Sequence, residues 1–169
     1  MKLIINSVNN NGGVYIVPAL GGLAAPYWDR KARASIQGLS LDTSASHLVR
    51  AAVEAMAFQT LDIIEKLNEF PVSSLKVDGG AASSNFLCQF LADITGLQVQ
   101  RPFELERTAL GAAYVAGLSI GIWNSLDEIS NSWTAERIFE PVAKNSDREK
   151  LKSEWKEAVN RTLIGGIKK

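Results

Sequence analysis

The residues with the clearest chemical potential lie at positions 75–86, Leu-Lys-Val-Asp-Gly-Gly-Ala-Ala-Ser-Ser-Asn-Phe. An apolar, strand-like run ends in Asp78-Gly79-Gly80, and a small polar segment then opens a helix. Adjacent glycines let the backbone turn sharply without a Cβ, so a flat or anionic ligand can approach it closely. The free N–H groups of the following helix attract negative charge. This order is typical of one wall of a nucleotide site, although plain strand-to-helix connections use it too.

The composition of the chain excludes several classes of function. Its 169 residues suit one domain with a hydrophobic core, and 18 basic and 18 acidic residues balance to zero net charge. A balanced charge argues against binding to nucleic acid. Cys88 is the single cysteine, which excludes an internal disulfide, and its apolar helical surroundings favour a buried, inert thiol. His47 is the single histidine, so no zinc cluster is expected and a structural role is favoured for it.

The sequence also bears on location. No run of residues has the length and apolarity needed to cross a membrane, and the first residues lack the pattern of a cleaved signal peptide. We therefore expect a cytoplasmic protein that does not bind a membrane.

The elements that must position the glycine turn follow from hydrophobic periodicity and turn residues. Strand-like and helix-like segments alternate, which indicates an α/β fold with helices packed on the sheet and the turn at the carboxyl end of its strand. The strand that stops at Pro102 is compatible with a sheet edge. We expect strands at 14–18, 35–39, 72–77 and 97–102, an extended segment at 137–141, and helices at 42–70, 84–95, 106–121, 125–129 and 146–164.

Helix ends have recognisable residues. Asp42 or Thr43 is the candidate N-cap of the long helix, Gly96 is the expected C-cap of the helix after the turn, and Thr108 is expected to cap the helix built of small residues. Because positions i and i+4 face each other on a helix, Arg50 and Glu54 predict a surface ion pair worth a few tenths of a kcal/mol.

Three aromatic residues have packing as their preferred interpretation. Tyr27 and Trp28, in the glycine-rich loop 19–33, are expected to pack in the core or between lobes rather than stack on a substrate. Trp155 is expected to anchor the last helix to the core.

Three blocks of sequence, 13–29, 34–54 and the pair 77–81 with 108–113, resemble the C-terminal part of the FGGY carbohydrate kinases, and among these the glycerol kinases most. The resemblance covers nearly the whole chain. It implies the actin-like ATPase (ribonuclease H-like) fold, with a mixed sheet flanked by helices. It also implies that 1–169 is a single domain, most of the C-terminal lobe, and that the N-terminal catalytic lobe is absent.

The resemblance assigns a nucleotide site to the glycine turn. In the family, the second glycine of Asp-Gly-Gly and the residue four positions further on contact the adenine nucleotide, which are Gly80 and Ser84 here. Gly79, Asp78 and Asn85 complete the expected ATP-binding set. Glycerol kinases usually have asparagine at the position of Ser84, and in this chain asparagine is displaced by one, to Asn85. Asp78 could orient the turn or hold a water near Mg²⁺, and it could equally cap the turn or helix.

The implied function is the nucleotide-binding lobe of an ATP-dependent glycerol kinase, which uses ATP and Mg²⁺. The family's catalytic aspartate and its glycerol-binding residues lie upstream of Met1, so we expect no catalytic residue, no metal ligand and no activity in this chain alone. The alternatives are the lobe of another sugar or polyol kinase, for xylulose or gluconate, and a non-catalytic interaction module. A dinucleotide oxidoreductase is disfavoured because no Gly-x-Gly-x-x-Gly is present. Apolar surface left by a missing lobe predicts a homo-oligomer.

Overall fold

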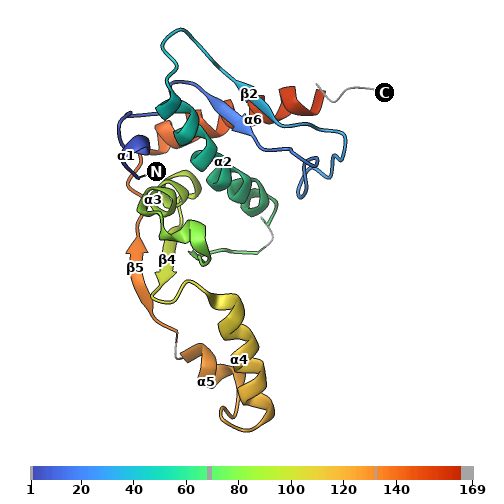
Figure 1. Ribbon diagram of the computed structural model, residues 1–169, viewed down its shortest axis with the longest axis vertical. Coiled ribbons are helices and arrows are strands. Elements are labelled where there is room, and N and C mark those ends of the chain that lie inside the picture. The colour runs from blue at the N-terminus through green and yellow to red at the C-terminus, as the bar shows by residue number, and fades with distance from the viewer. Residues whose placement is uncertain (1, 68–69, 132, 165–169) are drawn as a thin grey trace.

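The computed structural model describes residues 2–67, 70–131 and 133–164 (Figure 1). Its body is organised around helix α2 (Ala45–Lys66), which packs on helix α3 (Asn85–Thr95) and on strand β1. Helix α6 (Asn145–Ile164) lies across β1 and α3 and closes the core from the other side. Within the described residues, no helix combines the length and the apolarity needed to span a bilayer.

Two small sheets carry the strands. Strands β1 and β2 are antiparallel, whereas the second sheet has the order β3-β4-β5, with β3 parallel and β5 antiparallel to β4. The expected α/β fold with helices flanking a mixed sheet is therefore confirmed. The strands are β1 (Tyr15–Val17), β2 (Ser35–Gln37), β3 (Ser74–Lys76), β4 (Gln98–Pro102) and β5 (Ala135–Phe139).

The strand that ends at Pro102 does not lie at a sheet edge, although its proline made it compatible with one. Strand β4 is the central strand of its sheet, because β5 returns from a distant part of the sequence to pair with it. Pro102 is tolerated because it is the last residue of β4, at the point where the register against β5 shifts. A proline at that point leaves the inner ladder intact.

Helix ends differ from expectation at two N-termini. Helix α2 begins after Ser44, whose extended backbone makes it the N-cap, whereas the Thr43 hydroxyl accepts from the Ser40 N–H at 2.9 Å and closes the preceding turn. Helix α4 (Arg107–Ser119) follows Glu106, so Thr108 is an exposed residue of the first turn and not its cap. Gly96 ends α3 with φ at 73°, as predicted. The remaining elements are α1 (Lys2–Ile5), the 3-10 helix η1 (Gly80–Ser83) and α5 (Leu126–Asn131).

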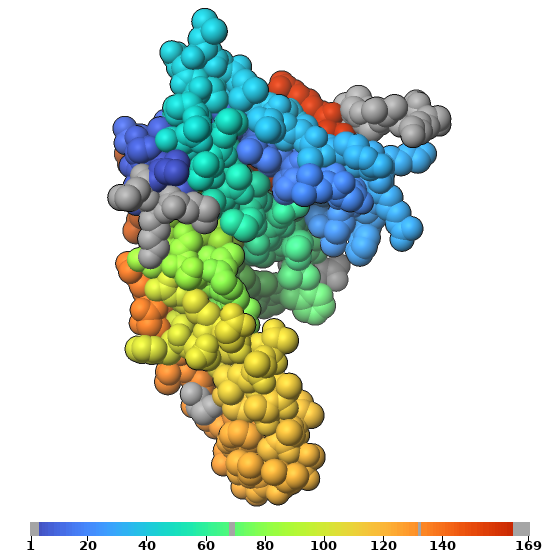
Figure 2. Space-filling view, viewed as in Figure 1, coloured from blue at the N-terminus to red at the C-terminus, as the bar shows by residue number. Residues whose placement is uncertain are grey.

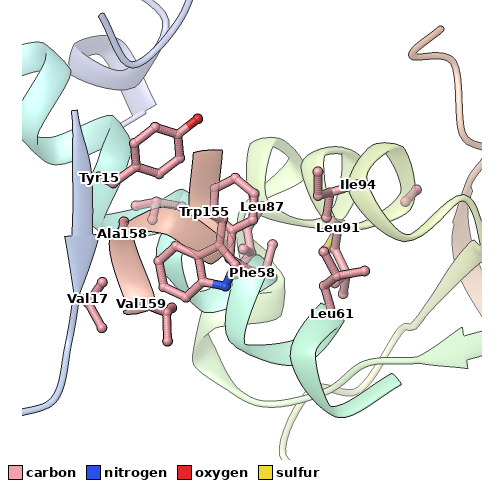
Figure 3. Close-up of a cluster of buried hydrophobic side chains, with 14 of the residues drawn as sticks. Tyr15, Val17, Phe58, Leu61, Leu87, Leu91, Ile94, Trp155, Ala158 and Val159 are labelled. Carbon is pink, nitrogen blue, oxygen red and sulfur yellow. The ribbon is translucent and has the colours of Figure 1, made fainter. Parts of the chain in front are cut away.

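The core is centred on aromatic rings, of which Figure 3 labels Phe58 of α2, Trp155 of α6 and Tyr15 of β1. Phe58 of α2 is 1% exposed and stacks on Trp155 of α6 with ring centroids 5.0 Å apart. Phe90 of α3 packs edge-on against Phe58, with ring centroids 5.4 Å apart. The Trp155 indole N–H donates to the Asp62 carboxylate at 3.0 Å, so its polar edge is satisfied within the core. Trp155 thus anchors α6, as the sequence predicted.

The prediction of a surface ion pair between Arg50 and Glu54 is wrong in its location. The two side chains do pair, at 2.7 Å, but Glu54 is only 2% exposed. The N-terminal segment covers them, since Arg50 also donates to the Val8 carbonyl at 2.8 Å and lies over the Phe86 ring. Burial raises the pKa of Glu54 despite the neighbouring guanidinium.

Residues 103–131 project from the body as a separate arm, which Figure 2 shows in yellow and orange. Its small residues allow close packing within the arm itself: the Trp123 ring covers Gly117 so closely that a Cβ there would clash, and it meets Tyr114 edge-on. The arm also exposes large apolar side chains, namely Val115, Ile120, Ile122 and Leu126.

Replacement of Phe58 by alanine is expected to lower the free energy of unfolding by about 3–5 kcal/mol, because it removes the ring between Trp155 and Phe90 and leaves a cavity. Chemical denaturation measures this change. Phe103→Ala is the matched control, since Phe103 is 85% exposed and its loss should change stability by less than about 0.5 kcal/mol. Equal effects of the two variants contradict the assignment of the core.

Asp62 predicts a pH dependence of stability. Burial, the largest cause, raises the pKa of Asp62 and outweighs the Trp155 hydrogen bond, which lowers it. Between the ordinary aspartate pKa and this raised value, the folded protein binds more protons than the unfolded chain, so stability falls as the pH rises. Asp62→Asn should therefore flatten this fall when urea unfolding is measured from about pH 4 to about pH 7. The exposed Asp42→Asn should leave it unchanged, and an unaltered profile in Asp62→Asn contradicts the prediction.

Candidate functional site

The candidate site is the turn 78–85 that joins β3 to α3. The Val77 N–H still pairs with the Gln100 carbonyl at 3.0 Å, after which the chain leaves the sheet. Gly79 has φ 77° and ψ 171°, a combination that is essentially restricted to glycine, and its N–H donates to the Leu105 carbonyl at 2.9 Å. Helix α3 begins at Asn85, within one residue of the predicted start at Ser84, and the short 3-10 helix η1 occupies the segment between the glycine turn and α3.

Both glycines present an open face. A Cβ built at Gly79 or at Gly80 meets no other atom within 4 Å. Gly80 has no positive φ, so the backbone conformation does not demand glycine at that position. Glycine at position 80 therefore matters for access rather than for folding: it keeps the backbone of the turn open to a ligand.

Ser84 and Asn85 mark the start of α3. The Ser84 hydroxyl accepts from the Leu87 N–H at 3.3 Å, which makes Ser84 the N-cap, and its own proton stays available for donation to a ligand. Within the described chain, the backbone N–H groups of Asn85 and Phe86 have no protein acceptor. They point out of the first helical turn, where anions bind. The Asn85 side chain is directed elsewhere, to Arg101.

Asp78 is exposed at the head of the turn. Among the described residues, its carboxylate makes no hydrogen bond, and the caps of η1 and α3 are Gly79 and Ser84. The possibility that Asp78 caps the turn or the helix is therefore excluded, and its carboxylate stays free to face a ligand or a bound water.

The residues of the turn line two separate hollows. Ser84, Asn85 and Phe86 face one of about 370 Å³, which Arg137 and Phe139 of β5 complete. Asp78 lies at the rim of a second, of about 200 Å³, whose walls come mainly from α2 and α3. Neither Gly79 nor Gly80 lines either of these two hollows. The five predicted site residues are thus brought together on one turn, and those that line a hollow are divided between the two.

Arg101 of β4 holds this turn from beneath, and sequence reasoning did not single it out. Its Nη1 donates to the Ala82 carbonyl at 3.1 Å and to Asn85 Oδ1 at 2.9 Å, while Nε and Nη2 donate to Glu136 at 3.0 and 2.8 Å. The available signal was its spacing: Arg101 and Val99 fall on the same buried face of β4, where a charge is unusual.

Cys88 lies under the turn as a buried thiol, as predicted. Its Sγ donates to the Ala82 carbonyl at 3.3 Å, and burial raises the pKa of Cys88. His47 has the structural role expected of it, since its Nδ1 accepts from the Ser44 N–H at 3.1 Å at the start of α2.

The turn does not form a metal cage by itself. No group of three or more histidine, cysteine, aspartate or glutamate side chains suited to a metal ion occurs in the described part of the chain. Mg²⁺ needs only one or two carboxylates when nucleotide phosphates and waters supply its other ligands. Asp78 fits that limited role, so the residues are compatible with a magnesium ion that arrives with a nucleotide.

The loop 19–33 separates its two aromatic residues. Tyr27 is half-buried and packs against the core, and burial raises its pKa. Trp28 is 77% exposed with φ at 52°, beside a hollow of about 430 Å³ that is lined by Gly21–Ala24 and Arg30. Packing in the core is therefore correct for Tyr27, whereas Trp28 is outside the core and its packing between lobes stays a prediction.

A strand, an open glycine turn and a capped helix in a mixed α/β body occur in a class of α/β domains that includes nucleotide-binding ones. Residues 2–120, well over half of the chain, match the model of the "FGGY family of carbohydrate kinases, C-terminal domain". The chain belongs to the FGGY family of carbohydrate kinases.

Curated relatives extend the likeness beyond the matched domain. The glycerol kinase of Alkaliphilus metalliredigens is 49% identical over 165 residues, which cover 96% of this chain and 33% of that protein. Glycerol kinase 2 of Thermotoga maritima is 50% identical over 163 residues, covering 95% and 33%. The chain spans about a third of the length of these relatives.

Solved structures agree on the fold. The glycerol kinase of Plasmodium falciparum, crystallised with ADP, is 39% identical with a TM-score of 0.82, over 95% of this chain and 33% of that one. The xylulose kinase of Lactobacillus acidophilus also gives a TM-score of 0.82, at 24% identity and over 98% of this chain and 34% of that one. The second likeness concerns the fold alone.

The two glycines of the turn are expected to respond differently to alanine. Gly79→Ala should lower the free energy of unfolding by about 1–3 kcal/mol, because its backbone conformation excludes a Cβ even though the space is open. Gly80→Ala should change it by less than about 0.5 kcal/mol. Thermal unfolding of both variants tests the pair, and a larger loss at Gly80 contradicts the described turn.

Proposed function

We propose that this chain is the nucleotide-binding C-terminal lobe of an ATP-dependent glycerol kinase. The observation that carries the proposal is that Gly79 and Gly80 have open Cβ positions in the same turn as the N–H groups of Asn85 and Phe86, which have no acceptor among the described residues. A flat or anionic ligand can rest on such a backbone without displacing a side chain. In the full-length enzyme, the reaction converts ATP and glycerol to ADP and glycerol 3-phosphate.

The roles of the turn residues follow from their contacts. Gly80 offers its backbone, Ser84 offers the hydroxyl proton that its capping bond leaves available, and Asp78 faces a water of the Mg²⁺ that accompanies the phosphates. Asn85 acts indirectly, because its side-chain oxygen is occupied by Arg101 at 2.9 Å. Gly79 sets the direction of the turn.

Glycerol is the proposed substrate because the curated relatives at 49% and 50% identity are glycerol kinases. Lobes of xylulose and gluconate kinases share the fold at 24% identity, so a different polyol or sugar is the alternative substrate class. Phosphoryl transfer requires charge stabilisation from several directions, and one turn supplies it from one side only. We therefore propose that the chain alone binds nucleotide and does not catalyse transfer.

The exposed apolar side chains support a lobe that packs against further protein. Leu20 is 84% exposed in the glycine-rich loop, and Ile120 is 74% exposed on the arm. Such surface also fits the alternative of a non-catalytic interaction module, and it supports the expected self-association. Nucleotide affinity separates the two functions, since a module has no need of it.

Calorimetric titration with Mg·ADP tests the proposal. The chain should bind, and Gly80→Arg should abolish binding because its side chain occupies the open face while the fold is kept. Gly111→Arg is the matched control: Gly111 also has an open Cβ position, but on the arm, and its variant should bind like the wild type. Equal binding by both arginine variants places the nucleotide away from the turn.

Ser84→Asn restores the asparagine usual in glycerol kinases and should tighten binding, since a longer side chain reaches further over the turn. If neither the wild type nor Ser84→Asn binds Mg·ADP at millimolar concentration, this chain does not hold a nucleotide by itself and the proposal fails in that form.

A further inference from the structure

Arg101 is a buried cation on the central strand of the mixed sheet. It is 9% exposed, and its guanidinium carbon lies 5.3 Å from the centre of the buried Phe139 ring. A buried charge is strongly unfavourable unless each of its donors is satisfied. Here Nε, Nη1 and Nη2 all donate, two of them to Glu136 and one to the turn.

The contacts of Arg101 with the turn involve a single nitrogen and two acceptors. Nη1 reaches the Ala82 carbonyl in η1 and the side chain of Asn85, the first residue of α3. Ser84, the N-cap, lies between these two acceptors in the sequence. Arg101 thereby holds the chain on both sides of Ser84, the residue expected to contact the nucleotide, at Ala82 and at Asn85.

The other end of the turn is held from the segment that follows strand β4. The Gly79 N–H donates to the Leu105 carbonyl, which lies four residues beyond Arg101. The segment 101–105 therefore holds the turn at its beginning and at its end. These contacts leave the Cβ position of Gly80 open, since a Cβ there would meet no other atom within 4 Å.

We propose that Arg101 is a positioning residue for the nucleotide, which acts by holding the 78–85 turn in its binding shape without touching the ligand. This inference rests on the proposed nucleotide site. Glu136, with a side chain 34% exposed, orients the guanidinium but does not contact the turn. Lysine cannot replace Arg101, because one ammonium group cannot reach the turn and Glu136 with the same planar geometry.

Arg101→Lys tests the role, with Glu136→Gln as the matched control. The glutamine keeps an oxygen for Arg101 and leaves both bonds to the turn in place. We expect Arg101→Lys to raise the Kd for Mg·ADP about tenfold, the effect of losing one or two charge-assisted hydrogen bonds. Glu136→Gln should keep a Kd close to that of the wild type. Thermal unfolding shows that both variants are folded, and a purely structural role predicts lower melting temperatures with an unchanged Kd.

Amide hydrogen exchange of residues 79–87 provides a readout that needs no nucleotide. Exchange there should be faster in Arg101→Lys than in Glu136→Gln. If the wild type fails to bind ADP, the proposed function fails, and unchanged exchange in Arg101→Lys separately overturns the positioning role. Wild-type affinity in Arg101→Lys, or equal loss in both variants, also overturns it.

A second variant covers the case in which Arg101→Lys does not fold. Asn85→Ala changes an exposed residue and removes only one of the two acceptors in the turn. Weaker ADP binding together with faster exchange at 79–87 supports the positioning role. Unchanged affinity and unchanged exchange overturn it.

Discussion

The contact on which the body of this protein depends is the stack of Trp155 on Phe58, completed by the bond from the indole N–H to Asp62. It joins α6 to α2 across 93 residues of sequence. Helix α6 also binds the two-stranded sheet of β1 and β2. The Tyr15 hydroxyl donates to Glu154 at 2.7 Å, and Gln37 donates to the Ala158 carbonyl at 2.9 Å. With α2 held in this way, α3 packs on a fixed surface, and the turn that precedes α3 is held in place at its C-terminal end.

The candidate site combines a rigid base with an open surface. Its base is made by residues whose hydrogen bonds are satisfied, such as Arg101 and Cys88, and its surface by glycine backbone and a serine hydroxyl. A site of this kind pays little conformational entropy when a ligand arrives, since the turn is already ordered. Among the described residues, no group of three or more histidine, cysteine, aspartate or glutamate side chains suited to a metal ion lies around it.

Local signals in the sequence were sufficient for the strand–turn–helix unit. Glycine at position 96 and serine at position 84 are good caps because of their own backbone and side-chain preferences, and both occur as caps where predicted segments end or begin. The family resemblance was equally accessible, because it rests on contiguous motifs.

Long-range contacts explain what the sequence did not reveal. Glu54 was expected at the surface because its burial depends on the N-terminal segment, whose Val8 carbonyl lies 42 residues from Arg50. The central position of strand β4 was not evident from the sequence, because its second partner, β5, returns only after the whole arm. The contacts of Arg101 could not be predicted for the same reason, since its acceptors lie 16, 19 and 35 residues away in the sequence.

The arm formed by residues 103–131 leaves the sheet at Pro102 and returns at Ala135, and these two residues are register partners. Its two ends therefore lie side by side, so that β4 and β5 form a hairpin whose loop happens to contain two helices. Such a loop can be shortened, exchanged or enlarged over evolution without altering the strand order, provided that Leu105 still meets Gly79. The arm is the natural place for related proteins to differ in length while they keep the same turn.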